Sequence, residues 1–346
     1  MRRLLLLVLL ISLLVMPVSA MDITAPSAPS DAQELMPMET ESFADGLWTV
    51  IKSAIGNFAP DLKTAAGSCL SLICIVILAS ILNSVPGCSK KVIRLVSTLA
   101  LGTVFVGQAN AMIELCASTV RQISDYGMLL LPVMTTALAA QGGTTGATAL
   151  YAGTTIFNSL LSSLIAKLLV PLVYVFLALS IANSATGEDL LKRLRDFIKW
   201  LMTWGLKMIL YVFTGYMSIT GVITGTADAA AVKAAKLTIS GAVPVVGGIL
   251  SDASEAVIIG AGVMKNAVGV YGLLAVIAIW ITPFLQIGSI YLLLKSTAIV
   301  CSVFGVKESS DLIEDFSGAM GLLLGMTGTV SLLILISTIC FMKGMG

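Results

Sequence analysis

Long apolar runs separated by short polar segments occupy most of the chain after residue 64. A helix needs about 20 apolar residues to cross the hydrocarbon core of a bilayer, and several of these runs are shorter. The pattern predicts an all-α, polytopic membrane bundle with six to nine spans, in which some short runs form re-entrant hairpins. The runs cover residues 65–85, 95–113, 127–141, 146–166, 168–184, 203–223, 270–284, 286–304 and 318–341.

The first 64 residues have a different pattern. Residues 1–20 combine two arginines, an apolar stretch over 4–15 and small residues ending at Ala20, which predicts a cleavable signal sequence. An uncleaved anchor is the alternative, although the apolar stretch is short for a span. We expect residues 21–64 to form a short acidic extracytoplasmic region and residues 65–346 to form the multi-span helical domain.

Composition supports an integral membrane protein. Of the 346 residues, 57% are hydrophobic and 11% are charged, whereas soluble proteins are about 25% charged. The net charge of +1 gives no reason to expect a nucleic-acid partner. The chain has no histidine, which excludes His-ligated metal sites and a His general base, and it has no phosphate-binding loop motif. We therefore expect a non-enzymatic protein without a cofactor or metal.

Basic residues form two clusters. The first follows the run over 65–85 and the second precedes the run over 203–223. With an extracytoplasmic start, the positive-inside rule predicts that both clusters lie in the cytoplasm. The same scheme places the acidic segment 308–315 outside and Lys343 inside. The clusters are Lys90, Lys91 and Arg94, then Lys192, Arg193, Arg195 and Lys199.

The second basic cluster lies in an amphipathic segment over residues 190–204. Its apolar side chains fall on one helical face and the basic side chains fall away from it. This pattern is typical of a helix lying in the membrane interface on anionic headgroups, and a docking helix for a cytoplasmic partner is the alternative. The predicted interfacial basic residues are Lys192, Arg193, Arg195 and Lys199.

Two glycine-containing segments predict close helix packing or a break. Four glycines share one face of the last run, where another backbone can approach closely within the subunit or across an oligomer contact. The Ala/Thr/Gly-rich segment 134–155 is interrupted at Gly142 and Gly143, which predicts a broken helix or hairpin. That hairpin either lines part of a pore or packs through its small residues. The four glycines are Gly318, Gly321, Gly325 and Gly328.

Residues 225–267 form a polar segment within the apolar domain. We predict two helical elements, separated around residues 244–248, that return into or lie along the outer side of the membrane. A polar stripe on the second element would face a conduit, water or a partner subunit. A carboxylate pair in that stripe, Asp252 and Glu255, also leaves open a self-contained secondary transporter with a coupling site there. The candidate conduit-facing or partner-facing residues are Asp252, Glu255, Lys265 and Asn266.

The same region carries a family resemblance. The motifs TADAAAVKAAK, PVVGGILSDASE and VMKNAVG lie between Gly225 and Gly272, and this run resembles the signature segment of the stage III sporulation protein AE family. A looser resemblance extends from Leu129 to Phe304.

The resemblance implies a subunit of a channel or secretion-like complex that supports endospore development. It implies a place in the mother-cell membrane around the forespore. The implied partners are other proteins of the stage III A operon, including a secretion-type ATPase and ring-forming subunits. Stage II sporulation protein Q would be contacted indirectly across the intermembrane space. The resemblance implies no catalytic residue or cofactor.

Overall fold

The computed structural model describes residues 25–37, 43–86, 89–140, 144–242 and 247–343, and the side chains of residues 57, 59–61, 64 and 221–266 lie outside this description. The described residues form helices and no strand, which confirms the all-α prediction. The helices are α2 (Ser30–Gln33), α3 (Phe43–Asn57), α4 (Ala59–Asn83), α5 (Lys90–Ala140), α6 (Thr144–Leu164), a π-helical turn (Ile165–Leu169), α7 (Val170–Thr186), α8 (Asp189–Ala242), α9 (Gly247–Ser302) and α10 (Lys307–Lys343).

Three pairs of predicted apolar runs merge into single helical rods. α5 contains both runs of the first pair, α6 and α7 continue through the π-helical turn, and α9 contains both runs of the third pair. The prediction of separate spans or re-entrant hairpins is therefore wrong for these pairs. In α5 the polar residues between the runs, such as Glu114, Arg121 and Asp125, lie on the exposed face, so the helix continues while its other face stays packed.

Five helical rods in the described part of the chain are long and apolar enough to cross a membrane, and the count of six to nine spans for the whole chain stays a prediction. The described side chains of α8 end at residue 220, inside the predicted run over 203–223, so a span in α8 stays a prediction. Helices of 51 to 56 residues are about 77 to 84 Å long, well beyond the hydrocarbon thickness of about 30 Å. The candidate spans are Ala65–Asn83, Lys90–Ala140, Thr144–Thr186, Ala267–Ser302 and Lys307–Lys343.

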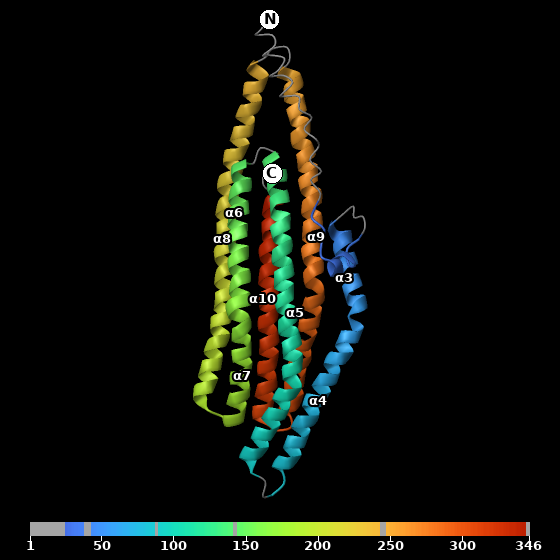
Figure 1. Cartoon of the computed structure of the whole chain (residues 1–346), viewed down its shortest axis with the longest axis vertical. Coiled ribbons are helices and arrows are strands. Elements are labelled where there is room, and N and C mark those ends of the chain that lie inside the picture. Colours follow the sequence, from blue (N-terminus) through green and yellow to red (C-terminus); the bar gives the residue numbers. More distant parts are fainter. Residues whose placement is uncertain (1–24, 38–42, 87–88, 141–143, 243–246, 344–346) are drawn as a thin grey trace.

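α10 lies at the centre of an elongated bundle (Figure 1). It contacts α5, α6, α7, α8 and α9. Its Phe316 stacks on Phe105 of α5, with ring centroids 4.0 Å apart and planes 7° from parallel, and both rings are buried. α4 lies at the side of the bundle, where it packs on α5 and α9. Around α10, α5 and α8 run in the same direction as α10, whereas α6–α7 and α9 run in the opposite direction (Figure 1).

Two predicted breaks coincide with helix ends. α5 ends at Ala140 and α6 begins at Thr144, which agrees with the predicted break, and Gly142 and Gly143 themselves lie outside the described residues. α8 ends at Ala242 and α9 begins at Gly247, which agrees with the predicted separation of the polar segment. Each half of that segment is the end of a long helix, and these ends extend past α5, α6 and α10 (Figure 1).

Some predictions concern residues outside this description. The signal sequence over 1–20 lies there as a whole. The side chains of the polar stripe also lie outside it, so what they face stays a prediction. The residues concerned are Asp252, Glu255, Lys265 and Asn266.

Candidate functional site

The connections α4–α5, α7–α8 and α9–α10 meet at one end of the bundle. Arg94 donates from Nε to the carbonyl oxygen of Ala185 (3.1 Å) and from Nη2 to that of Thr186 (2.7 Å), which ties α5 to the end of α7. Ser184 donates through Oγ to the carbonyl oxygen of Glu308 (3.1 Å), which ties α7 to α10. The two bonds from Arg94 satisfy carbonyls at the C-terminal end of α7, which lack intrahelical partners.

Charged residues gather at this end, which we call the charged end. Both basic clusters lie here, together with the acidic start of α10. The prediction that segment 308–315 lies opposite the basic clusters is therefore wrong, and Lys343 lies at the far end of α10. The reason is that the chain runs along the bundle twice between the two basic clusters, through α5 and then the α6–α7 rod. It runs along the bundle twice more through α8 and α9, so the start of α10 returns to the same end. The charged end comprises Lys90, Lys91, Arg94, Glu188, Asp189, Lys192, Arg193, Arg195, Asp196, Lys199, Lys295, Lys307, Glu308, Asp311, Glu314 and Asp315.

Arg195 is the buried centre of this cluster. Its guanidinium lies 2.8 Å from Oδ1 of Asp196 and 2.5 Å from Oδ2 of Asp315, and the Arg195 and Asp315 side chains are only 11% and 14% exposed. Burial lowers the pKa of Arg195, but the bond to Asp196 and the charges of Asp315 and Asp196 outweigh this effect and raise it overall. The prediction that Arg195 is one of the exposed basic residues of an interfacial helix is wrong, because its side chain is buried and its partner Asp315 lies across the α8–α10 contact.

The outer face of the same segment carries large apolar side chains instead. Phe197, Trp200 and Trp204 are exposed, and neighbouring rings of the three stack with centroids 6.0 and 5.9 Å apart. Segment 190–204 is the start of the continuous helix α8 rather than a separate helix. Tryptophan side chains are enriched where a bilayer meets water, which is compatible with an interfacial position of this face. The interfacial role of the exposed residues Lys192, Arg193 and Lys199 stays a prediction.

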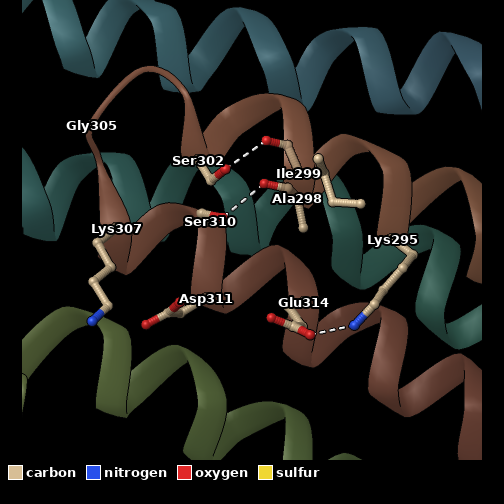
Figure 2. Close-up of a pocket in the computed structure, with 9 residues that line it drawn as sticks. All are labelled: Lys295, Ala298, Ile299, Ser302, Gly305, Lys307, Ser310, Asp311 and Glu314. Atoms are coloured by element: carbon tan, nitrogen blue, oxygen red, sulfur yellow. Dashed lines mark hydrogen bonds and ion pairs between the residues drawn. The ribbon is translucent and has the colours of Figure 1, made fainter.

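A cavity of about 430 Å³ lies beside the α9–α10 turn (Figure 2). In this view the ends of four charged side chains form a row, with Lys307 and Lys295 at its two ends and Asp311 and Glu314 between them. Lys295 and Glu314 form an ion pair. The lining residues are Lys295, Ala298, Ile299, Ser302, Gly305, Lys307, Ser310, Asp311 and Glu314.

The chemistry of this cavity favours binding of charged groups. Two amines and two carboxylates balance one another in its wall, so it can accept side chains of either sign from a partner. Its serine hydroxyls already have acceptors: Ser302 donates to the carbonyl oxygen of Ile299 (2.7 Å) and Ser310 to that of Ala298 (2.8 Å). Among the described residues, no group of three or more His, Cys, Asp or Glu side chains could hold a metal ion.

The predicted glycine face of α10 packs against this chain's own helices. A Cβ built at Gly318 would lie 3.1 Å from Nζ of Lys199 on α8, and one at Gly321 would lie 3.4 Å from the Tyr291 ring on α9. Gly325 and Gly328 repeat this alternation against Leu206 and Trp280, at 3.7 and 4.0 Å. Packing within the subunit thus accounts for the stripe, and an oligomer contact stays a prediction.

Sequence reasoning missed the glycines at the closest helix contacts. A Cβ at Gly153 would overlap the ring of Tyr216, and at Gly127 and Gly272 it would lie 2.6 and 2.7 Å from Ile334 and Leu130. These glycines do not form a regular stripe in the sequence. Spacing shows which glycines share a face, but it does not show what lies opposite them.

A buried polar group inside the bundle was also missed. Asn158 of α6 is fully buried, and its Nδ2 donates to the carbonyl oxygen of Ser124 on α5 (3.2 Å), while its Oδ1 has no hydrogen-bond partner among the described residues. One turn away, Thr154 and Ser337 form a hydrogen bond between α6 and α10. The signal available in the sequence was the amide side chain within the apolar run over 146–166.

Comparisons with known proteins point to one family. The sequence model described as stage III sporulation protein AE matches residues 31–346. The stage III sporulation protein AE of Bacillus subtilis (strain 168) is 22% identical over 228 residues, which is 66% of this chain and 57% of that protein. The match therefore spans little more than half the length of this relative. No solved structure matches the chain.

Proposed function

Because the chain belongs to the stage III sporulation protein AE family, we propose that it is a non-enzymatic membrane subunit of a channel or secretion-like complex between mother cell and forespore. In this proposal it resides in the mother-cell membrane that surrounds the forespore. The family match and the five candidate spans support a membrane protein of sporulation, which is the premise of the proposal.

The observation that carries the proposal is the gathering of charge at one end of the bundle. The two basic clusters favour a cytoplasmic position for this end by the positive-inside rule. The cavity beside the α9–α10 turn would then be open to a cytoplasmic partner, and we propose the secretion-type ATPase of the same operon as that class of partner. The α8–α9 hairpin at the other end would face the intermembrane space, toward the ring-forming subunits and, indirectly, stage II sporulation protein Q.

The test is a deletion in the native host, complemented with intact and altered genes. The altered gene encodes Lys307→Ala with Asp311→Ala, two exposed cavity residues for which the described structure shows no ion pair. We expect normal membrane levels but small forespores and reduced late forespore gene expression. Co-purification of the ATPase with a tagged chain should also fall.

A matched control removes one basic and one acidic residue from the same end but outside the cavity. Asp189→Ala with Lys192→Ala meets this requirement, since both residues are exposed on α8. We expect near-normal spores from this variant. Normal spores in the deletion strain itself would contradict the proposed function, and equal defects in the two variants would contradict the role of the cavity.

A secondary transporter was the alternative interpretation of the sequence. It depends on Asp252 and Glu255, whose side chains lie outside the described residues. No observation in the described part of the structure favours it over the channel-complex proposal.

A further inference from the structure

A second cavity lies at the charged end, where the starts of α5 and α10 come together. Its volume is about 310 Å³. It takes residues from the end of α4, the first two turns of α5, the α9–α10 turn and the start of α10. The lining residues are Asn83, Lys90, Lys91, Arg94, Ser97, Gly305, Val306 and Glu308.

The wall of this cavity is predominantly basic. Three cationic side chains face one carboxylate, that of Glu308. Arg94 is held in place by its bonds to the carbonyls at the end of α7. Lys90 and Lys91 are exposed, and neither forms an ion pair within the described part of the chain. The cavity therefore presents cationic groups whose charge has no internal partner, together with the polar side chains of Asn83 and Ser97.

The ends of two helices add to this positive character. α5 begins at Lys90 and α10 begins at Lys307, directly beside the cavity residue Glu308. The first turn of a helix leaves backbone N–H groups without intrahelical acceptors and carries the positive end of the helix dipole. Both helix starts thus reinforce a preference for an anion that the three cationic side chains already establish.

Exposed apolar side chains adjoin the cavity on both sides. On α5, Val92 and Val96 are 60% and 58% exposed, and on the α9–α10 turn Val303 is 82% exposed and Phe304 is 37% exposed. Val92 and Val96 belong to the candidate span Lys90–Ala140, and Val303 and Phe304 directly follow the candidate span Ala267–Ser302, so all four would lie near lipid tails in a membrane. A free anion would gain nothing from them, whereas a molecule with an anionic head and apolar tails would use the cavity and its surroundings together.

We propose that this cavity binds the phosphate-containing headgroup of an anionic phospholipid, with the acyl chains lying along Val92, Val96 and Val303. Basic pockets between helices on the cytoplasmic side of a membrane are suited to such headgroups. The lipid would link the α4–α5 and α9–α10 connections, which share this cavity, and would hold the charged end at the headgroup level of the bilayer.

The experiment counts lipids bound to the full chain, purified in detergent, by native mass spectrometry. The probes are phosphatidylglycerol, phosphatidylcholine and inorganic phosphate. We expect phosphatidylglycerol to bind at least tenfold more tightly than phosphatidylcholine. Inorganic phosphate at millimolar concentration should displace little of it, because the free anion lacks the apolar contacts.

The variant that tests the cavity is Lys90→Gln with Lys91→Gln. One basic side chain near an anionic headgroup changes affinity about fivefold, so the pair should weaken phosphatidylglycerol binding about 25-fold. The matched control is Lys52→Gln with Lys63→Gln, which removes the same charge from exposed positions on α3 and α4, outside both the cavity and the predicted interfacial segment. We expect the control to change affinity less than threefold.

Each other outcome overturns the proposal. Equal loss of binding in the two variants would show attraction to overall charge rather than to this cavity. Equal affinity for phosphatidylglycerol and phosphatidylcholine would show that the site does not recognise the negative charge of the headgroup. Full displacement by inorganic phosphate would identify a site for a free anion instead of a lipid.

Discussion

Arg195 of α8 and Asp315 of α10 form an ion pair in which only 11% and 14% of the two side chains are exposed. The pair joins two helices that are 120 residues apart in the sequence. Removing one partner from such a buried pair costs up to about 3 kcal/mol, although Asp196 still compensates part of the charge of Arg195 when Asp315 is removed. We therefore expect Asp315→Ala to lower the thermal unfolding temperature of the purified chain clearly, as measured by loss of the monodisperse species after heating.

The pair can be separated from its neighbours by a double-mutant cycle. Arg195→Met with Asp315→Leu removes both charges and keeps much of the volume, so it should lose less stability than the sum of the single changes. Arg193→Met, two residues away and exposed, is the control and should change stability by less than about 0.5 kcal/mol. Additive losses in the cycle would show that Arg195 and Asp315 are not coupled.

The same pair shows what the sequence could and could not predict. Helical class, the membrane environment and the breaks near Gly142 and near residue 245 follow from local hydropathy and turn residues. The inward direction of the Arg195 side chain does not follow from the sequence, because the apolar pattern of segment 190–204 predicts that this side chain is exposed. The burial of Arg195 depends on its ion pair with Asp315, which lies on a helix distant in the sequence.

The division of long helices into separate runs was wrong for a related reason. Polar residues such as Glu114 and Asp125 divide the apolar runs of α5, yet they lie on its exposed face and leave the helix continuous. Hydropathy averaged along the sequence cannot distinguish a polar turn from a polar stripe. The acidic start of α10 was misplaced for the same reason, because each miscounted span reverses the predicted side of everything after it.

Gly153 of α6 is a second critical position. A Cβ there would lie 2.6 Å from Cζ of Tyr216 on α8, whose hydroxyl donates to the carbonyl oxygen of Ala149 (2.9 Å). The Tyr216 ring is attached to α8 at one end and held by this hydrogen bond at the other, so it cannot move aside easily. We expect Gly153→Ala to destabilise the folded chain by about 1 to 3 kcal/mol, measured by thermal unfolding in detergent.

The control for this substitution is Gly205→Ala on α8, where a Cβ would meet no atom within 4 Å. A neutral or slightly stabilising effect is expected there, because alanine favours the helix. Adding Tyr216→Leu to Gly153→Ala should recover part of the loss. If Gly153→Ala unfolds at the same temperature as the unaltered protein, the α6–α8 contact is not as close as described.

Asn158 allows stability and function to be separated. Its Oδ1 is buried without a partner among the described residues, so an apolar side chain of similar size removes a cost rather than adding one. We expect Asn158→Leu to keep its unfolding free energy within about 1 kcal/mol, and Asn158→Asp to lose clearly more, because it buries a charge. Thermal unfolding of both variants measures this difference.

Sporulation assays then give the second readout for Asn158. If the amide serves only packing, Asn158→Leu will complement a deletion fully. A folded Asn158→Leu protein at normal membrane levels that fails to complement would assign the polar interior a role in the proposed conduit. A strongly destabilised Asn158→Leu would instead show that the bond to the carbonyl oxygen of Ser124 outweighs the unpartnered oxygen.

Membrane topology provides the sharpest test of the helical arrangement. Lys192, Lys307 and Lys343 are all exposed, and the structure places the first two at the charged end and the third at the far end of α10. In a variant without the six native cysteines, we introduce Lys192→Cys, Lys307→Cys or Lys343→Cys and express the chain in vegetative cells, so that it lies in the plasma membrane. A membrane-impermeant maleimide is then added to intact protoplasts of these cells. We expect labelling of Lys343→Cys before permeabilisation, and of the other two only afterwards.

The comparison of positions 192 and 307 decides between the structure and simple span counting. Counting nine short runs places the acidic segment after Lys307 opposite the basic clusters, whereas the α8–α9 hairpin returns the chain to the side from which it left. Opposite labelling of Lys192→Cys and Lys307→Cys would therefore contradict the two continuous helices between them. Equal protection of both positions, with Lys343→Cys reactive, would support the bundle with its charged end in the cytoplasm.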